Sequence, residues 1–138
     1  IGTEQGMDRS LVSSIKKIVE KTKQAKKFKL IIALNYGGRT EIVDAVKKVG
    51  TALSEGKISL REINENLFTN YLYTSGIPDP DLLIRTSGEM RVSNFLLWQI
   101  SYTELWATPI YWPDFGRAEL VQAIEEFNKR QRRFGGRP

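Results

Sequence analysis

Short apolar runs alternate with amphipathic segments along this chain, and this alternation constrains the fold more than any other feature. Residues 30–34 form a continuous apolar run, which predicts a strand buried on both faces, and they lead into a turn with two adjacent glycines. Residues 82–84 and 108–112 predict two further short strands. Because helical segments separate these runs, the sequence predicts an α/β fold, a mainly parallel sheet flanked by helices.

The helical segments are defined by apolar spacing and by capping residues. Residues 9–25 carry apolar side chains three and four positions apart, behind Asp8 as a suitable N-cap. A second helix is expected between the glycine turn and Gly56, and a capping box of Ser59 and Glu62 is expected to open a third.

Two more helices are predicted in the second half of the chain. Residues 94–102 are apolar and predict a helix. Asp114 is expected to cap a last helix that runs to about residue 132, with glycines closing the ordered part.

The composition excludes several kinds of chemistry. The 138 residues include no cysteine and no histidine, which excludes disulfides, thiol nucleophiles, Ser-His-Asp triads and nearly every transition-metal site. A bound metal would need oxygen ligands, which favours magnesium or calcium. No apolar run is long enough to span a membrane, and this length predicts a single domain.

The charge is moderately basic. Lysine and arginine number 21 against 16 acidic residues, a net charge of +5, which favours nucleic acid, phosphorylated metabolites or an acidic membrane surface as partners. Seven lysines lie between Lys16 and Lys29, with Glu20 as the only acid among them. A solvated helix face is the simplest interpretation of this cluster.

The segment of residues 85–94 carries the most chemical information. Arg85 stands at the end of a predicted strand, Gly88 lets the chain reverse, and Arg91 returns towards the same place. Ser93 stands at the predicted start of a helix, where free backbone N–H groups and the helix dipole favour an anion. Two guanidinium forks and a hydroxyl at a helix start describe a phosphate or diphosphate site.

An ordinary surface loop fits the same spacing. In that interpretation Ser93 is only an N-cap, and the two arginines pair with one of the nearby acids, Asp79, Asp81 or Glu89.

Other candidates are weaker. Glu104 lies among aromatic residues and fits either a magnesium ligand beside a diphosphate or a partly exposed helix acid. Residues 35–39 could cradle a second anion, although they match neither a Walker loop nor a dinucleotide-binding fingerprint. Residues 132–136 are either a frayed basic tail or an arm that reaches another site. The aromatic residues between 98 and 115 favour a core or a subunit interface over nucleobase stacking.

Taken together, these segments resemble the cis-prenyltransferase family, also called isoprenyl transferases, whose bacterial representative is undecaprenyl diphosphate synthase. The order and spacing of six runs carry the resemblance: LNYGGR (34–39), DLLIRTSGE (81–89), RVSNFLLWQ (91–99), YTEL (102–105), WPDF (112–115) and RRFGG (132–136). The resemblance covers essentially the whole chain and only the C-terminal half of the family's length.

The resemblance implies a set of site residues. Those expected to bind substrate are Arg85, Arg91, Val92, Ser93, Arg133 and Gly135. The first four would hold the diphosphate of isopentenyl diphosphate, and the last two belong to a tail that completes a site across a homodimer interface. Glu104 would belong to a Mg2+ site, and residues 35–39 would mainly support the sheet edge near the site.

The resemblance also implies the reaction. Isopentenyl diphosphate would be condensed onto an allylic prenyl diphosphate with loss of the allylic diphosphate group and a proton, giving a Z-polyprenyl diphosphate such as undecaprenyl diphosphate. The expected location is cytoplasmic, with peripheral contact to the membrane for product release and no nucleic acid as partner.

The start of the chain suggests that it is a piece of a longer protein. It begins at Ile1 rather than at methionine, and the family's Asp-Gly-Asn-Gly-Arg-Trp motif, whose aspartate binds magnesium, does not occur. We therefore expect residues 1–138 to be the C-terminal portion of a single domain that holds no catalytic residue and is inactive alone. The alternatives are a non-catalytic accessory subunit of a prenyltransferase and a basic nucleic-acid-binding module.

Overall fold

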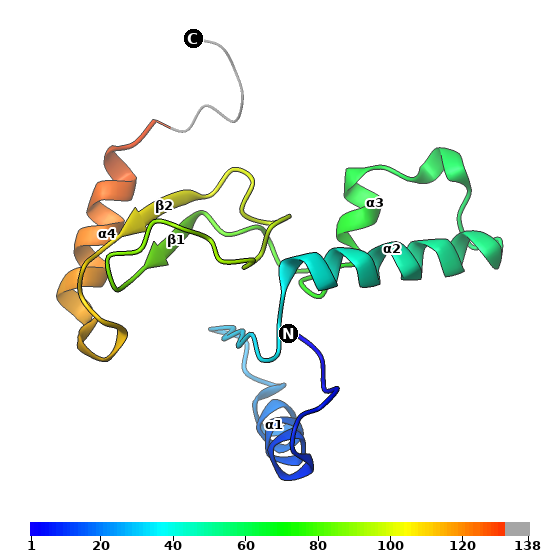
Figure 1. Ribbon diagram of the computed structural model, residues 1–138, viewed down its shortest axis with the longest axis horizontal. Helices are drawn as coiled ribbons and strands as arrows, with labels where there is room; N and C mark the ends of the chain where they lie inside the picture. Colours follow the sequence, from blue (N-terminus) through cyan, green and yellow to red (C-terminus); the bar gives the residue numbers. More distant parts are fainter. Residues whose placement is uncertain (132–138) are drawn as a thin grey trace. The chain divides into compact units, whose positions relative to one another are not determined.

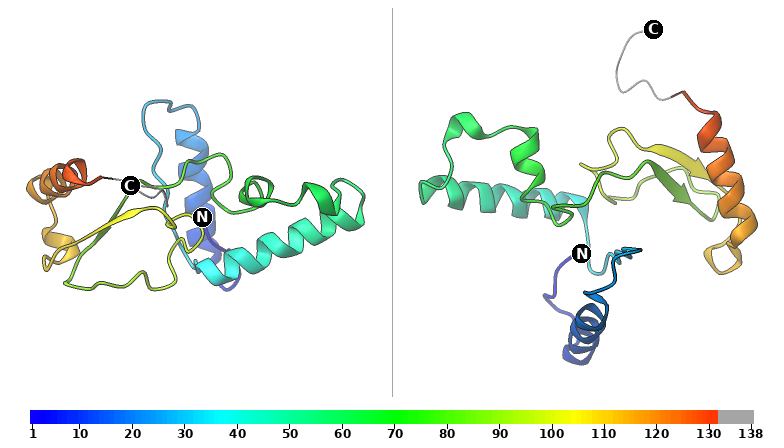
Figure 2. Two further views of the ribbon diagram at one scale, coloured as in Figure 1. Left: turned by 90° about the horizontal axis from the view of Figure 1, so that it is seen from above. Right: turned by 180° about the vertical axis from the view of Figure 1, so that it is seen from behind.

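The computed structural model describes residues 1–131 and divides the chain into two compact units, residues 1–76 and residues from 77 onward (Figures 1 and 2). The first unit contains α1 (Arg9–Thr22), α2 (Gly38–Ser54), the 3-10 turn η1 (Leu60–Glu62) and α3 (Glu65–Thr69). The second contains β1 (Leu82–Arg85), β2 (Glu104–Ala107), the 3-10 turn η2 (Trp112–Asp114) and α4 (Arg117–Lys129). Within residues 1–131, none of the helices combines the length and the apolar character needed to cross a membrane.

The first helix follows the prediction at its start and stops earlier than predicted. The Asp8 carboxylate accepts hydrogen bonds from the backbone N–H groups of Ser10 and Leu11, which confirms Asp8 as the N-cap. The helix ends at Thr22, three residues before the predicted end at Ala25, whose N–H donates to the Thr22 carbonyl in a tighter turn.

The predicted buried strand of residues 30–34 is wrong for the chain as described. The segment forms only an isolated parallel bridge between Gly2 and Leu34, and Leu30 is 72% exposed. A strand buried on both faces needs a hydrogen-bonded neighbour and covering elements. Residues 1–3 provide the pairing described here, in which Leu34 N–H donates to the Ile1 carbonyl at 3.0 Å.

The second helix confirms its prediction and forms the core of the first unit. Ala45, Val49 and Ala52 on α2 are buried, as is Leu72. Gly56, with φ of +68°, follows the end of α2 as predicted, because glycine adopts this left-handed conformation without a steric cost.

The third predicted helix is divided in two. The capping box of Ser59 and Glu62 is present, but it opens only the 3-10 turn η1. The chain then restarts as α3 behind a second cap, in which the Asn64 side chain accepts from Leu67 N–H at 2.9 Å.

A buried carboxylate ties α2 to the segment that follows α3. Glu41, which is fully buried, accepts hydrogen bonds from the Tyr36 hydroxyl and from the backbone N–H of Tyr73, the latter at 2.8 Å. The Tyr73 hydroxyl donates in turn to Asp44. The two tyrosine rings meet edge to face with centroids 6.3 Å apart. Burial of a carboxylate is tolerated here because donors converge on it.

We expect the Tyr73 hydroxyl to titrate late. Burial, followed by the hydrogen bond donated to Asp44, raises the pKa of Tyr73 to about 12. The native state therefore favours the protonated phenol, and the stability that this provides is present below the ordinary tyrosine pKa of 10.0 and lost as pH rises through about 12. Tyrosinate absorbance should show a late step that Tyr73→Phe removes.

Tyr111→Phe is the matched control, because Tyr111 is 67% exposed. This variant should keep the late step. Loss of the late step from Tyr111→Phe, or a wild-type titration without a late step, would contradict the expectation.

The second unit confirms the α/β prediction. Strands β1 and β2 pair in parallel, with Leu82 opposite Glu104 and Arg85 opposite Ala107 (Figure 1). Helix α4 packs against β2, where Trp106 is 6% exposed and its indole N–H donates to the Glu126 carboxylate at 2.7 Å. This contact between sheet and helix is the core of the unit.

The chain between the two strands differs from the prediction. Residues 94–102 form turns rather than a helix. Ser93, Asn94 and Leu96 have φ values of +47°, +62° and +47°, which a right-handed helix does not allow. The apolar side chains at positions 95–98 and 100 are instead half-buried in a connection made of turns.

The predicted strand 108–112 is also wrong, because β2 precedes it. The ladder reaches Thr108, whose N–H donates to the Arg85 carbonyl at 2.9 Å, and stops at Pro109, which has no N–H to donate. The predicted cap at Asp114 is wrong as well, because Asp114 lies in η2. Helix α4 starts behind Gly116, whose N–H donates to the Glu119 side chain at 2.7 Å.

Candidate anion-binding site

A tight turn at the end of β1 organises the candidate site. Ser87 and Gly88 have φ values of +69° and +70°, so the chain reverses immediately after Arg85, the last residue of the strand. The Ser87 N–H donates to the Ile110 carbonyl at 2.9 Å and the Gly88 N–H to the Thr108 carbonyl at 2.8 Å. These bonds pin the turn to the segment after β2, as expected for the carboxyl ends of parallel strands.

Both predicted arginines converge on one acid. The Glu89 carboxylate accepts two hydrogen bonds. Its Oε2 accepts from Nη2 of Arg85, and its Oε1 accepts from Nη2 of Arg91. The side chains of Arg85, Glu89 and Arg91 are 35%, 30% and 67% exposed, so the cluster is half-buried at Arg85 and open at Arg91. The structure therefore brings the two guanidinium groups together at one point.

The electrostatics of the cluster keep Glu89 ionised. The hydrogen bond from Arg85 lowers the pKa of Glu89, burial acts against it, and the charges of Arg91 and Arg85 lower it further. Two guanidinium charges and one carboxylate leave the cluster with an excess positive charge. The Nε of Arg85 is buried and has no acceptor among residues 1–131.

The other predicted diphosphate ligands follow Arg91 directly. Ser93 is exposed and sits in a turn, so the helix N-terminus that was expected to strengthen this position does not form. Val92 is half-buried, and its carbonyl accepts from the Phe95 N–H at 2.9 Å. The roles of Val92 and Ser93 toward a diphosphate stay predictions. Arg133 and Gly135 lie outside the described residues.

Glu104 has a partner that the sequence did not reveal. It begins β2, and its carboxylate accepts from Nη1 of Arg130 at 2.8 Å, while the same nitrogen donates to the Leu105 carbonyl at 2.9 Å. A spacing of 26 residues carries no local signal for this pair. It forms because α4 packs against β2, and Arg130, which follows the last residue of α4, reaches the start of that strand.

The described residues fit a magnesium ion only in part. Glu104 offers one carboxylate, and residues 1–131 contain no group of three or more histidine, cysteine, aspartate or glutamate side chains that could hold a metal. The remaining oxygen ligands would have to come from a bound phosphate group and water.

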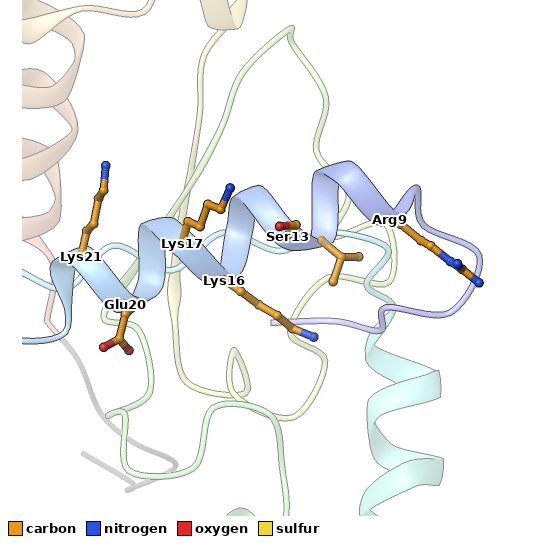
Figure 3. A pocket seen from close by; sticks show the side chains of 7 residues that line it. Arg9, Ser13, Lys16, Lys17, Glu20 and Lys21 are labelled. Carbon is orange, nitrogen blue, oxygen red and sulfur yellow. The ribbon is translucent and has the colours of Figure 1, made fainter.

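Two other predicted features are the glycine turn at residues 35–39, which makes structural hydrogen bonds, and the lysine-rich helix α1, which is exposed to solvent. The Asn35 amide donates to the Thr3 carbonyl at 3.2 Å and to the Gln5 carbonyl at 2.9 Å, so it ties the glycine turn to the N-terminal segment. Side chains along α1 line a shallow hollow over one helix face and extend away from the helix axis (Figure 3). Lys16 pairs there with Glu4 at 3.0 Å, and both side chains are well exposed.

The fold is α/β, and the candidate anion site is a pair of arginines at the carboxyl end of its parallel strands. The family model described as "Putative undecaprenyl diphosphate synthase" matches residues 1–135. The chain therefore belongs to this prenyltransferase family, which confirms the resemblance stated above.

Relatives and solved structures agree with this assignment. The chain is 56% identical over 122 residues to an isoprenyl transferase from Heliobacterium mobile, covering 88% of this chain and 47% of that protein. It is 48% identical over 136 residues to an isoprenyl transferase from Thermotoga maritima, covering 99% of this chain and 58% of that protein. The chain spans about half the length of the relatives that it matches.

The most informative solved structure is that of lavandulyl diphosphate synthase from Lavandula x intermedia in complex with dimethylallyl diphosphate. It matches with a TM-score of 0.94 and 38% identity, covering 98% of this chain and 58% of that one. A protein described as a "probable undecaprenyl diphosphate synthase" from Campylobacter jejuni matches with a TM-score of 0.82 and 34% identity, covering 98% of this chain and 61% of that one.

Proposed function

We propose that this chain is the part of a cis-prenyltransferase that binds the diphosphate of isopentenyl diphosphate. The complete protein would condense isopentenyl diphosphate onto an allylic prenyl diphosphate and form a Z double bond. One observation carries the proposal: Arg85 and Arg91 direct their guanidinium groups to a single point at the end of β1. The family assignment supplies the substrate class, and the dimethylallyl diphosphate held by the lavandulyl enzyme supports a prenyl diphosphate as ligand.

The chemistry assigned to this chain is binding and orientation. Guanidinium groups donate paired hydrogen bonds to phosphate oxygens, and two of them fix both the position and the direction of a diphosphate. Isopentenyl diphosphate held in this way would present its double bond to the allylic carbon of the second substrate. Ser93 would add a hydroxyl donor and Val92 a backbone group.

We further propose Glu104 as a single ligand of Mg2+, with phosphate oxygens and water completing the shell. When bound, the metal would neutralise negative charge on the diphosphate groups. Arg130 contacts Oε2 of Glu104 in this structure, so the metal would bind Oε1 or would displace the arginine from Oε2.

Glu104→Ala should raise the magnesium concentration needed for half-maximal activity of the complete natural protein. One of few oxygen ligands is lost, and the metal then binds more weakly. The measurement is activity during a titration with magnesium chloride. Glu125→Ala, which removes an exposed acid of α4, should leave the titration unchanged and serves as the control. An identical titration for Glu104→Ala would remove this residue from the metal site.

The proposed activity is tested by product formation. The complete natural protein that contains these 138 residues is supplied with isopentenyl diphosphate, an allylic diphosphate and magnesium, and the lipid products are separated by chain length. A polyprenyl diphosphate with Z double bonds supports the proposal. No product from the protein alone, together with product from a partner enzyme only when this protein is added, would establish the accessory-subunit alternative instead.

The remaining parts of the proposal concern assembly and location. We propose a homodimer in which Arg133 and Gly135 complete the site of the partner subunit, and peripheral contact with a membrane during product release. The sedimentation mass of the complete protein tests the first point, and co-sedimentation with anionic lipid vesicles tests the second.

A further inference from the structure

The acid between the two arginines has no assigned role in the proposed site. Glu89 is the only residue shown to contact both guanidinium groups within the described chain. An ordinary surface ion pair would occupy one arginine and would leave the other free to move. Glu89 instead uses its two oxygens separately, one for each guanidinium group, so a single carboxylate contacts both arginines.

We expect the Arg85 side chain to leave its present position if Glu89 is removed. Its Nε is buried without an acceptor among residues 1–131, and a buried donor without a partner is destabilising. An arginine side chain also has several rotatable bonds and loses rotamer freedom when it is held. The ion pair with Glu89 is the contact that offsets these costs in the structure.

Each arginine keeps donors available while it contacts Glu89. A guanidinium group carries five N–H donors, and the contact with Glu89 engages one terminal nitrogen of each arginine. The Arg85 Nε is buried, but phosphate oxygens can bind the remaining terminal N–H donors without displacing the acid. Because a phosphate and Glu89 can contact the arginines at the same time, Glu89 can position the arginines rather than only compete with the substrate for them.

We propose that Glu89 is the positioning residue of the diphosphate site: its carboxylate holds the guanidinium groups of Arg85 and Arg91 at the spacing that a diphosphate requires. The inference rests on the proposed function, because it names the diphosphate as the ligand. Glu89 itself does not contact the substrate in this arrangement.

Whether Glu89→Gln weakens or strengthens diphosphate binding distinguishes two roles of Glu89: positioning of the arginines, and electrostatic repulsion of the anion. Removing a negative charge beside an anion site strengthens anion binding if electrostatics alone matter. Loss of the two-sided contact instead lets the arginines separate and weakens binding. We expect Glu89→Gln to weaken binding about 10-fold, because arginines that lose their preorganisation must pay the ordering cost on binding.

The experiment uses calorimetric titration of the complete natural protein with two probes, isopentenyl diphosphate and inorganic pyrophosphate. Positioning predicts similar weakening for both probes, since they share the diphosphate group. Glu89→Asp keeps the charge on a shorter side chain and should recover part of the affinity. Glu125→Gln, at an exposed position of α4, is the control and should bind like the wild type.

Steady-state kinetics separate a local role from general disruption. The KM for isopentenyl diphosphate should rise in Glu89→Gln, while the KM for the allylic diphosphate and the urea midpoint stay close to wild type. Equal or tighter binding of both probes by Glu89→Gln overturns the positioning role. Failure of the wild-type protein to bind either probe overturns the proposed diphosphate site, and the role of Glu89 in it falls as well.

Discussion

Replacing Arg85 by alanine is expected to weaken binding of isopentenyl diphosphate by the complete protein about 100-fold. Hydrogen bonds to charged groups contribute about 1.5–3 kcal/mol each, and Arg85 is the less exposed of the two arginines. Arg91→Ala should have the smaller effect, about 10-fold, because its side chain is 67% exposed and water screens its charge. The measurement is the KM for isopentenyl diphosphate together with its calorimetric affinity.

The matched control removes an arginine elsewhere in the same unit. Arg117 is exposed in the first turn of α4, and Arg117→Ala should leave the KM for isopentenyl diphosphate unchanged. The double variant lacking Arg85 and Arg91 should lose less than the product of the two single effects, since both side chains share Glu89. Unchanged kinetics in both single variants would contradict the assignment of this site.

Trp106→Ala is expected to cause the largest loss of stability, about 3–5 kcal/mol of unfolding free energy. The indole is 6% exposed, packs edge to face on Phe115 with centroids 6.5 Å apart and donates to Glu126. The substitution leaves a cavity between β2 and α4 and removes the hydrogen-bond donor of a half-buried carboxylate. Urea denaturation of the complete protein provides the measurement.

Trp112→Ala is the control for this expectation. Trp112 also stacks on Phe115, with centroids 6.0 Å apart, but it is 72% exposed. Its loss should change the unfolding free energy by less than about 1 kcal/mol, as is usual for exposed side chains. Equal destabilisation by the two tryptophan substitutions would show that burial between β2 and α4 does not determine the stability of the unit.

Apart from the cap at Asp114, features that depend on neighbouring residues were predicted well from the sequence. The cap at Asp8, the box of Ser59 and Glu62 and the reversal at Gly88 are each determined by side chains within four positions, and all three are present. The convergence of Arg85 and Arg91 was also predicted, because a tight turn returns the chain on itself. The pairing of both arginines with Glu89 is the one that the surface-loop interpretation predicts for one of three nearby acids.

Features that depend on distant partners were predicted poorly. Residues 30–34 have the composition of a buried strand, but a strand needs hydrogen-bonded neighbours, and a local pattern does not say whether they are present. Residues 94–102 have the apolar composition from which a helix was predicted, yet positive φ values at Ser93, Asn94 and Leu96 prevent one. The pair of Glu104 and Arg130 depends on how α4 packs on β2, which no spacing encodes.

The connection between β1 and β2 determines the local stability of the proposed site. Parallel strands are usually joined by a helix, whose many internal hydrogen bonds break together. Here a chain of turns makes the connection, and Glu89, Arg91 and Ser93 all lie on it. Turns open one at a time at low free energy, so amide protons of this stretch should exchange with solvent well before those of α4. Most of the groups proposed to bind the diphosphate would thus lie on the part of the unit that unfolds locally at the lowest free energy. Arg85 lies instead on strand β1, which we expect to open less readily.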